Sequence, residues 1–556
     1  MSSVLLAAAT GILLYLGYRF YSPKVQQWLG LDESETPPSV EHQDGVDFVP
    51  AKHWTILFGH HFASIAGAGP IIGPVIACLY WGWLPVVAWI VVGSILFGAV
   101  HDFTALTLSL KHKGQSVAAV AESVLGKAGR NTFSIFVFLA LILVVAVFAA
   151  SAGKTLATTP SVVIPTFGLV IVAMVVGWLM YQMQVNLLLC SIIGVVLLFG
   201  LIVAGYYIPV ELPLENADKW WTAILLVYGL IASVTPVTIL LQPRDHLAAA
   251  VLFIGMFFGF AGLLLTRPEL NAPAVVAVSS PKGTMWPMMF IIVACGALSG
   301  FHSLVASGTT SKQLPHMKDA RIIGYGGMVL EAALAMFAVI AVAAGLHWKS
   351  IPRGMTGYVY QDVFSRGGWI KAFGTGYGEI TKVLLGGLGT LVGITMLKTF
   401  IMTTLDSATR ITRYVCNELF GDSLGIPFMK NKYAATLVVG VFAGALALGN
   451  WKAIWPAFGS ANQLIGSLVF IIATIYLMTR KRKYMFVLIP AVLMIVTTFT
   501  AMIFNLKNFL SSGQPKIMLS IITIVLFVIA IFVLYQSVAA VSGKKEVPRQ
   551  SQNENA

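Results

Sequence analysis

Charged side chains are scarce in this chain of 556 residues: Asp, Glu, Lys and Arg together make up 10% of it, whereas hydrophobic residues make up 58%. Soluble globular domains carry about 25% charged residues. The composition therefore excludes an ordinary soluble domain, and the mean hydropathy of +0.85 agrees with that. Because apolar runs of near 20 residues cross a bilayer as helices, the sequence predicts an all-α polytopic membrane protein.

Cysteine is scarce too, and the sequence contains no Cys-x-x-Cys pair of the kind found in redox and zinc sites. Each cysteine lies in or beside an apolar run, so we interpret them as small buried hydrophobic residues. They are Cys78, Cys190, Cys295 and Cys416.

Acidic residues are outnumbered: 22 Asp and Glu face 35 Lys and Arg, which gives a formal net charge of +13. Such a balance can indicate a nucleic-acid partner, but the basic residues lie in short clusters between apolar runs and not on a patch interleaved with aromatic residues. We therefore expect no nucleic-acid partner. Membrane lipid is the expected surrounding.

About fifteen apolar runs can be counted, which predicts about fifteen transmembrane helices. They lie near residues 3–20, 54–80, 84–110, 130–152, 160–181, 185–208, 219–242, 245–265, 285–310, 321–346, 381–410, 433–449, 453–479, 484–504 and 517–541. The first run has no positive segment before it, which favours a retained span over a cleaved signal. We expect one span and a cytoplasmic loop in residues 1–53, a core in 54–410, and peripheral spans with a basic tail in 411–556.

The basic residues also predict an orientation. With the N-terminus outside, the inside loops carry roughly twice as many Lys and Arg residues as the outside loops, as the positive-inside rule requires. The sequence therefore predicts an outside N-terminus and an inside C-terminus.

The most unusual stretch is GHHFASIAGAGPIIGP at residues 59–74. Pro70 and Pro74 lack the N–H group that a helix interior needs, and Gly67 and Gly69 permit an unwound backbone. Irregular backbone at membrane depth is tolerated only where it is buried in protein or lines a cavity. The sequence therefore predicts a broken helix, interrupted near residues 66–70.

A second interruption is predicted at residues 232–236, ASVTP, inside the run 219–242. It lies five spans after the first, which predicts two inverted five-span repeats, 54–208 and 219–410, in a LeuT-like fold. Helix N-termini at the two breaks would favour a carboxylate. The expected substrate-binding residues are Ser64, Gly67, Gly69, Ser233 and Thr235.

Ionisable groups inside spans cost about 2.5–3.5 kcal/mol each on insertion scales, so each one needs a reason. Several lie at one depth, which predicts a shared proton or cation site. The candidates are His60, His61, His101, Asp102, His302, Glu331, Lys398 and Asp406. Adjacent helical residues point about 100° apart, so only one of His60 and His61 is expected to face the site. Lys398 is expected to pair with Glu331 or Asp406.

Structural roles stand beside these functional ones. Either histidine of the 60–61 pair could simply bond a neighbouring carbonyl group, and Asp406 could lie at the membrane interface. A metal on His61, His101 and His302 is conceivable from ligand type, although their spacing matches no local metal signature. Whether the chain binds a metal therefore stays open.

Six motifs together carry a family resemblance. They are the stretch at 59–74, HDF at 101–103, QPRDHL at 242–247, SGFHSLVASGTTSKQL at 299–314, DSATR at 406–410 and FGSANQL at 458–464. In this order they resemble the carbon starvation protein A family. The resemblance implies a bacterial inner-membrane transporter of peptides, or of pyruvate with protons, that serves nutrient limitation as a stress response.

The sequence thus predicts a secondary active importer of a small carboxylate-bearing nutrient, a peptide or pyruvate, driven by protons or alternatively by sodium through alternating access. We expect neither an enzyme nor a cofactor. A channel or membrane sensor and a membrane-embedded histidine–metal enzyme are the alternatives. Substrate, coupling ion and oligomeric state stay open.

Overall fold

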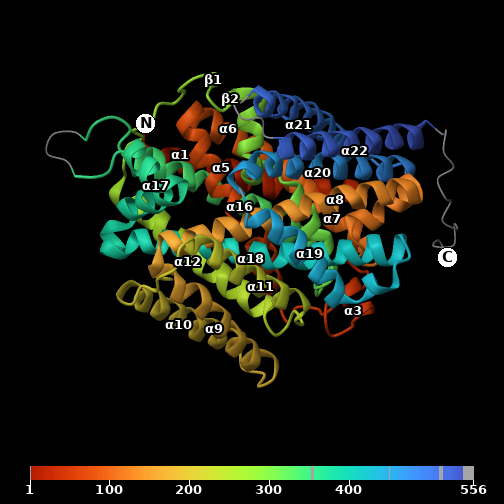
Figure 1. Ribbon diagram of the computed structural model, residues 1–556, viewed down its shortest axis with the longest axis horizontal. Helices are drawn as coiled ribbons and strands as arrows, with labels where there is room; N and C mark the ends of the chain where they lie inside the picture. The colour runs from red at the N-terminus through yellow and green to blue at the C-terminus, as the bar shows by residue number, and fades with distance from the viewer. Residues whose placement is uncertain (1, 352–355, 450, 512–516, 543–556) are drawn as a thin grey trace.

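The computed structural model describes residues 2–351, 356–449, 451–511 and 517–542 as a bundle of helices. Figure 1 shows the long helices running roughly side by side, with the N-terminus at one end of the bundle and the end of α22 at the other. Within the described residues, 13 helices are long and apolar enough to cross a membrane. The polytopic α-helical architecture is therefore confirmed, while the count of about fifteen is not.

The first half of the chain is helical nearly throughout. Its helices are α1 (Ser3–Leu16), α2 (Ser22–Leu29), α3 (Pro38–Glu41), α4 (Trp54–Ala66), α5 (Gly69–Trp81), α6 (Trp83–Gly93), α7 (Ala99–Lys111), α8 (Val117–Thr158), α9 (Val163–Tyr181), α10 (Leu187–Tyr207), α11 (Ala217–Val234) and α12 (Leu241–Thr266). Short π-helical turns at Gly17–Tyr21 and Ser94–Gly98 join α1 to α2 and α6 to α7.

The second half begins with a small hairpin, β1 (Ser279–Ser280) paired antiparallel with β2 (Gly283–Thr284). Its helices are α13 (Phe290–Ile292), α14 (Ala294–Ala297), α15 (Gly300–Val305), α16 (Ala320–Ala344), α17 (Tyr360–Leu385), α18 (Gly389–Cys416), α19 (Lys432–Ala447), α20 (Trp451–Thr479), α21 (Met485–Ser511) and α22 (Ile517–Val541).

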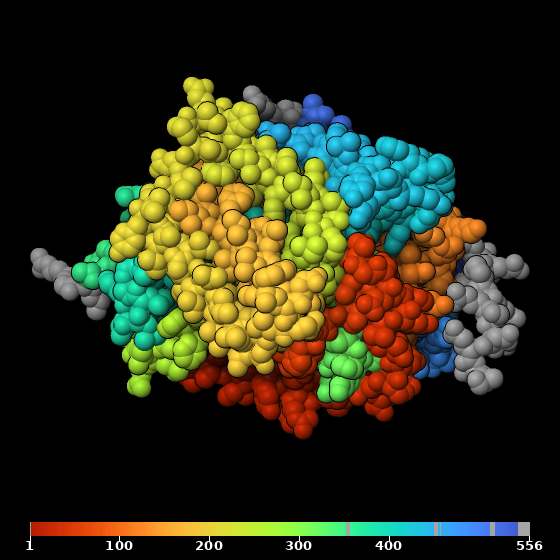
Figure 2. Space-filling view, turned by 90° about the horizontal axis from the view of Figure 1, so that it is seen from below, coloured from red at the N-terminus to blue at the C-terminus, as the bar shows by residue number. Residues whose placement is uncertain are grey.

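Helices α9 and α10 form part of the outer layer of the bundle, as Figure 2 shows on one face. They carry exposed large apolar side chains, which include Ile171, Trp178, Leu188 and Val196. An apolar exposed surface is what lipid contact requires of a membrane helix.

The first predicted interruption is present. Helix α4 ends at Ala66 and α5 begins at Gly69, and Gly67 between them has φ +29° and ψ −150°. A Cβ atom at Gly67 would come 2.9 Å from Thr404 Oγ1. Both the backbone conformation and the close approach therefore require glycine there.

The second predicted interruption is wrong. Residues 235–240 connect two separate helices, since α11 ends at Val234 and α12 begins at Leu241, and each is long enough to span a membrane. Pro243 lies in the first turn of α12, where its missing N–H has no intrahelical partner to lose. The prolines therefore mark the end of one helix and the start of the next.

The true second interruption lies in the run 285–310, which the sequence predicts as an ordinary span. Leu298 and Ser299 have extended backbones, with φ −160° and −126°, and they separate α14 from α15. A Cβ atom at Gly300 would come 2.0 Å from the Asn462 carbonyl oxygen, so only glycine fits where α15 begins.

The expected span 381–410 also needs correction. The turn Gly386–Leu388 divides it, with α17 ending before it and α18 starting after it. Gly386 has φ +54°, a conformation that favours glycine. Lys382 consequently lies near the end of a helix, where its side chain is exposed and 3.8 Å from Glu379.

Candidate functional site

The two interrupted segments lie against each other and run in opposite directions. A Cβ atom at Gly73 would come 2.2 Å from the Ile292 carbonyl oxygen, and one at Gly69 would come 2.3 Å from Cys295 Sγ. Further along, His61 Nδ1 lies 2.9 Å from Thr310 Oγ1. Residue numbers fall along α5 and α4 as they rise along α13–α15, so the segments are antiparallel.

A cavity of about 390 Å³ lies where these segments meet. Small-molecule pockets commonly measure ~300–1,000 Å³. Gly69, Gly73 and Cys295 contribute to its wall from the interrupted segments, and it also includes Lys282 from the β1–β2 hairpin. Asn462 of α20 and Asn505 and Asn508 of α21 add side-chain amides.

Asn462 supports the interrupted backbone. Its Oδ1 accepts a hydrogen bond from the Phe301 N–H at 2.7 Å, and its Nδ2 donates to Ser299 Oγ at 3.0 Å. Backbone groups released by an interrupted helix must find partners inside the protein. Two of the helices that the sequence predicts to be peripheral, α20 and α21, therefore belong to the site.

The lining favours an anion. The lysine ammonium of the hairpin and the amide N–H groups are hydrogen-bond donors, and the N-terminus of α5 begins at the cavity wall. Helix N-termini carry a partial positive charge and unpaired N–H groups. The cavity is thus chemically suited to a small carboxylate.

Four of the predicted ionisable residues form one buried chain of contacts, the carboxylate–histidine chain. His101 Nδ1 lies 2.9 Å from Asp102 Oδ1, and His302 Nδ1 lies 2.9 Å from Asp102 Oδ2. His302 Nε2 lies 3.4 Å from Glu331 Oε2. Helices α7, α15 and α16 therefore bring together four of the eight candidate residues, which lie far apart in sequence.

His60 and Asp406 belong to a different cluster, the arginine network. His60 Nδ1 lies 2.6 Å from Asp245 Oδ2, and Arg244 Nη2 lies 2.5 Å from Asp245 Oδ1. Arg244 Nη1 also donates to Asp406 Oδ2 and, at 2.8 Å, to the Tyr228 hydroxyl. The four side chains His60, Arg244, Asp245 and Asp406 are buried in the protein.

Sequence reasoning missed Arg244 and Asp245 because the apolar runs 219–242 and 245–265 leave Arg244 between two spans and Asp245 at the first position of a span. The first turn of α12 instead holds both side chains inside the bundle. The sequence did contain a signal. A proline marks a helix start, and the Arg–Asp pair that directly follows it would lie in that helix, where the arginine could pair with an acidic residue of another span.

Both histidines of the 60–61 pair are buried, and their side chains reach different partners. His60 joins the arginine network, whereas His61 contacts Thr310 and lies close to α16, where a Cβ atom at Gly327 would come 2.9 Å from its ring. Because adjacent helical residues point about 100° apart, the two side chains reach different neighbours.

The predicted ion pair of Lys398 is wrong. The Lys398 ammonium is buried and donates to the Ala152 carbonyl oxygen of α8. Glu331 instead lies next to His302, and Asp406 next to Arg244. The sequence alone could not reveal that α8 supplies the hydrogen-bond partner of the lysine.

The predicted substrate-binding residues separate into two groups. Gly69 lines the cavity, and Ser64 and Gly67 precede it in the chain, with Ser64 Oγ 2.7 Å from Ser407 Oγ. Ser233 Oγ lies 3.2 Å from Thr436 Oγ1 of α19, and the Thr235 hydroxyl bonds the Ile231 carbonyl oxygen at 2.8 Å. Ser233 and Thr235 thus do not face the first interruption.

The loop that precedes α4 contacts α18 and two other segments of the chain. Asp47 of this loop lies 2.8 Å from Arg410 and 3.1 Å from Arg413 of α18. The backbone N–H of Val49 donates to the Lys312 carbonyl oxygen, and that of Val237 donates to the Val46 carbonyl oxygen. We refer to residues 46–51 with these partners as the end clamp.

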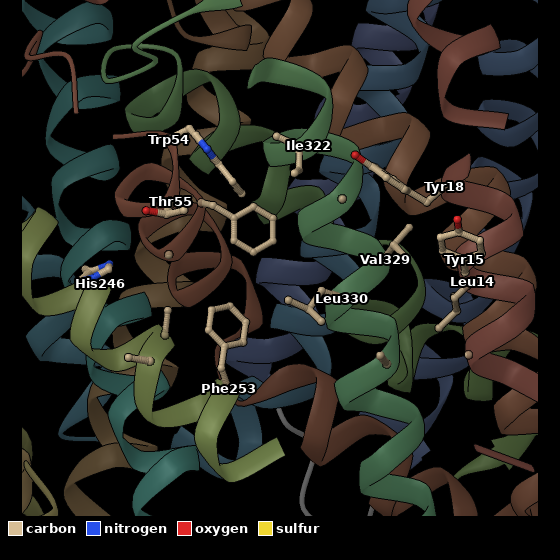
Figure 3. Close-up of a pocket in the computed structure, with 17 residues that line it drawn as sticks. Leu14, Tyr15, Tyr18, Trp54, Thr55, His246, Phe253, Ile322, Val329 and Leu330 are labelled. Carbon is tan, nitrogen blue, oxygen red and sulfur yellow. The ribbon is translucent and has the colours of Figure 1, made fainter. Parts of the chain in front are cut away.

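A second cavity, of about 680 Å³, is apolar and separate from the interruptions. Figure 3 shows that its labelled residues come from α1, the π-helical turn that follows it, α4, α12 and α16, with Phe253, Val329 and Leu330 on its walls. The described residues that line it include no lysine or arginine to bind a carboxylate, so the cavity at the interruptions is the candidate substrate site. Among the residues described, no group of three or more His, Cys, Asp or Glu could hold a metal ion.

An α-helical membrane bundle with a polar cavity at two interrupted helices has the architecture of a solute transporter. Solved structures agree on the fold: a mutant of the manganese transporter of Eremococcus coleocola aligns with a TM-score of 0.51 at 11% identity, covering 90% of this chain and 98% of that one.

The family follows from sequence. Residues 2–352 and 351–501 match the family described as carbon starvation protein CstA, and the chain belongs to that family. It is 31% identical to the pyruvate/proton symporter BtsT of Escherichia coli K12, over 93% of this chain and 83% of the relative. It is 30% identical to the peptide transporter CstA of Bacillus subtilis, over 97% of both chains. The chain is therefore a membrane transporter and not an enzyme.

Proposed function

We propose that this transporter imports a small carboxylate, pyruvate or a short peptide, together with protons by alternating access. One observation carries the proposal: Cys295, a wall residue of the anion-suited cavity at the two interrupted segments, lies within electrostatic reach of Glu331 in the buried carboxylate–histidine chain. Relatives named as a pyruvate/proton symporter and as peptide transporters support both substrate classes.

Histidine favours protons over sodium as the coupling ion. An unperturbed imidazole titrates near pH 6.5, close to working pH. The carboxylate–histidine chain contains two imidazoles and two carboxyl groups in contact, and none of its four members is a lysine or arginine. Such a chain can gain and lose a proton with little movement of its atoms.

We further infer an inner-membrane location with the N-terminus outside and the C-terminus inside, and a role during carbon starvation. The positive-inside bias of the loops supports the orientation. The LeuT-like inverted repeat also remains a proposal, now with 285–311 in place of 219–242 as the partner of the broken segment 54–81. Their antiparallel course supports such a relation.

The test is uptake by the purified chain in proteoliposomes, with radiolabelled pyruvate and dialanine offered under an inward proton gradient, an inward sodium gradient, or neither. We expect accumulation of one substrate under the proton gradient alone. Accumulation driven only by sodium would overturn proton coupling, and flux without accumulation would indicate a channel.

Lys282→Ala should raise the KM about tenfold or more, since a hydrogen bond to a charged group is worth about 1.5–3 kcal/mol. Lys349→Ala, which removes an exposed lysine that does not line the cavity, is the matched control. Equal KM values for the two variants would remove Lys282 from the substrate site.

A further inference from the structure

The two buried clusters differ in how their charges and protons are balanced. In the arginine network, His60 Nδ1 faces a carboxylate oxygen of Asp245, and His60 Nε2 lies 3.0 Å from Thr309 Oγ1. Thr309 Oγ1 also lies 3.1 Å from the Val305 carbonyl oxygen. Because a hydroxyl can donate or accept, Thr309 gives His60 Nε2 a partner in either tautomer.

The arginine network is held together by direct contacts between its members. Arg244 lies between the carboxyl groups of Asp245 and Asp406, and His60 contacts Asp245. Each ring nitrogen of His60 and both carboxylate oxygens of Asp245 have a partner within hydrogen-bond distance, and Asp406 has one through Oδ2 but none through Oδ1. Breaking one member of a buried paired set leaves an uncompensated charge, which is strongly unfavourable. A change of protonation in this network would therefore be unfavourable during transport.

The carboxylate–histidine chain is incomplete by the same criteria. Both histidines direct Nδ1 at Asp102, one at each carboxylate oxygen, so Asp102 has two partners inside the chain of contacts. Within the described part of the chain, neither carboxylate oxygen of Glu331 has a hydrogen-bond partner, and neither does Nε2 of His302. An unpaired carboxylate in a buried site is costly, so Glu331 needs a proton of its own or one shared with His302.

Glu331 is also placed to sense the cavity. The titratable groups that face it are His302 on α15, Asp102 on α7 and Cys295 on α14, with His61 on α4 nearby. Cys295 belongs to the cavity wall beside Gly69. Substrate in the cavity would therefore act on Glu331 across a single wall residue.

We propose that Glu331 and His302 carry the coupling proton, with Asp102 as their fixed counter-charge, and that the arginine network is structural. The assignment rests on the proposed proton coupling. Loading adds a proton from water to a Glu331 oxygen and gives the neutral acid. On release the Glu331 O–H bond breaks as the proton moves to His302 Nε2 and gives the imidazolium, and the Nε2–H bond then breaks as the proton passes to water.

The test compares two neutral substitutions of similar size, Glu331→Gln and Asp245→Asn, in proteoliposomes with whichever of pyruvate and dialanine the wild type accumulates. Accumulation under a proton gradient should be lost in Glu331→Gln, while substrate exchange without a gradient persists and no longer varies with pH. Asp245→Asn should lower the unfolding temperature, and its remaining accumulation should keep the pH profile of the wild type.

Proton uptake on substrate addition, followed with a pH dye on purified protein, tests the same assignment if Glu331→Gln does not fold. His302→Gln should abolish that uptake and Asp245→Asn should retain it. Accumulation by Glu331→Gln, or a shifted pH profile in Asp245→Asn, would overturn the inference. A wild type that accumulates neither substrate would instead overturn the proposed function.

Discussion

At the scale of single residues, the interrupted backbone depends on side chains from elsewhere in the chain. Asn462 bonds Ser299 in the break between α14 and α15 and Phe301 directly after it, a role that the motif FGSANQL does not reveal. The sequence could predict that the first segment breaks, because two prolines and several glycines stand in one run. It could not reveal which distant amide satisfies the second break.

Asn462→Ala should therefore reduce both stability and transport. The Phe301 N–H would lose its acceptor, and a buried unsatisfied donor costs about 1–3 kcal/mol. Thermal unfolding in detergent and uptake in proteoliposomes measure the two effects. Asn508→Ala, which removes an exposed amide of the same cavity, is the control for stability. An unfolding temperature unchanged by Asn462→Ala would show that the amide does not hold the break.

Lys398 allows packing to be separated from charge. Lys398→Ala should destabilise the protein by about 2–4 kcal/mol, because it removes a buried four-carbon chain and leaves a cavity. Lys398→Met keeps most of that volume, and the Ala152 carbonyl loses only its side-chain donor. We expect Lys398→Met to unfold within a few degrees of the wild type. Equal destabilisation by both variants would assign the lysine a role through its charge.

At the scale of elements, close backbone approach fixes where the second segment can break. Gly300→Ala should abolish folding, since its Cβ atom would lie 2.0 Å from one backbone atom of α20 and 2.4 Å from another. Gly200→Ala in α10 meets nothing within 4 Å. That control should be neutral or stabilising by up to about 1 kcal/mol. Expression and monodispersity in detergent compare the two, and a well-folded Gly300→Ala would contradict the packing described.

The end clamp should not respond to pH in the working range. Burial of the Asp47 carboxyl opposes its ionisation, but Arg413 and Arg410 outweigh that effect and lower its pKa to about 2. A carboxyl with a depressed pKa stabilises the fold above its ordinary pKa near 3.8, and this contribution is lost as pH falls through about 2.

Asp47→Asn should consequently lower the unfolding temperature by the same amount at pH 8 and at pH 5. Melting curves at the two pH values test this, with Asp44→Asn as the control, since the Asp44 carboxylate bonds backbone N–H groups of the same loop. A difference between wild type and Asp47→Asn that shrinks already at pH 5 would mean that the arginines do not hold the carboxylate ionised.

At the scale of the whole molecule, composition predicts the membrane bundle and motif order predicts the family. The internal symmetry is harder to predict, because Gly and Pro residues occur at ordinary helix ends as well as in interrupted spans. Pro236 and Pro243 belong to a connection and a helix start, whereas the break at Leu298 and Ser299 contains neither residue type. Local chemistry thus locates irregular backbone, while packing against α5 and α20 decides which irregularity lies inside the membrane.

The chain ends provide a direct test of topology. The described chain begins and ends at opposite ends of the bundle (Figure 1), so reporters fused to the N-terminus and to the C-terminus should lie on opposite sides of the membrane. An alkaline phosphatase fusion should be active only at the outside end. The 13 candidate spans of the described residues are an odd number, which places the two ends on opposite sides. Activity at both ends would contradict this.

Helix α8 has 42 residues, and at 1.5 Å per residue it is about 63 Å long, twice the hydrocarbon thickness of about 30 Å. Gly126, with φ +70°, bends it near its start. The straight remainder still exceeds the bilayer, so it must tilt or protrude. Helix α8 packs on both α18 and α20, and α20 contributes Asn462 to the cavity wall. A change in bilayer thickness that alters the tilt of α8 would therefore act on that wall. Transport rates should therefore vary with the acyl-chain length of the surrounding lipid.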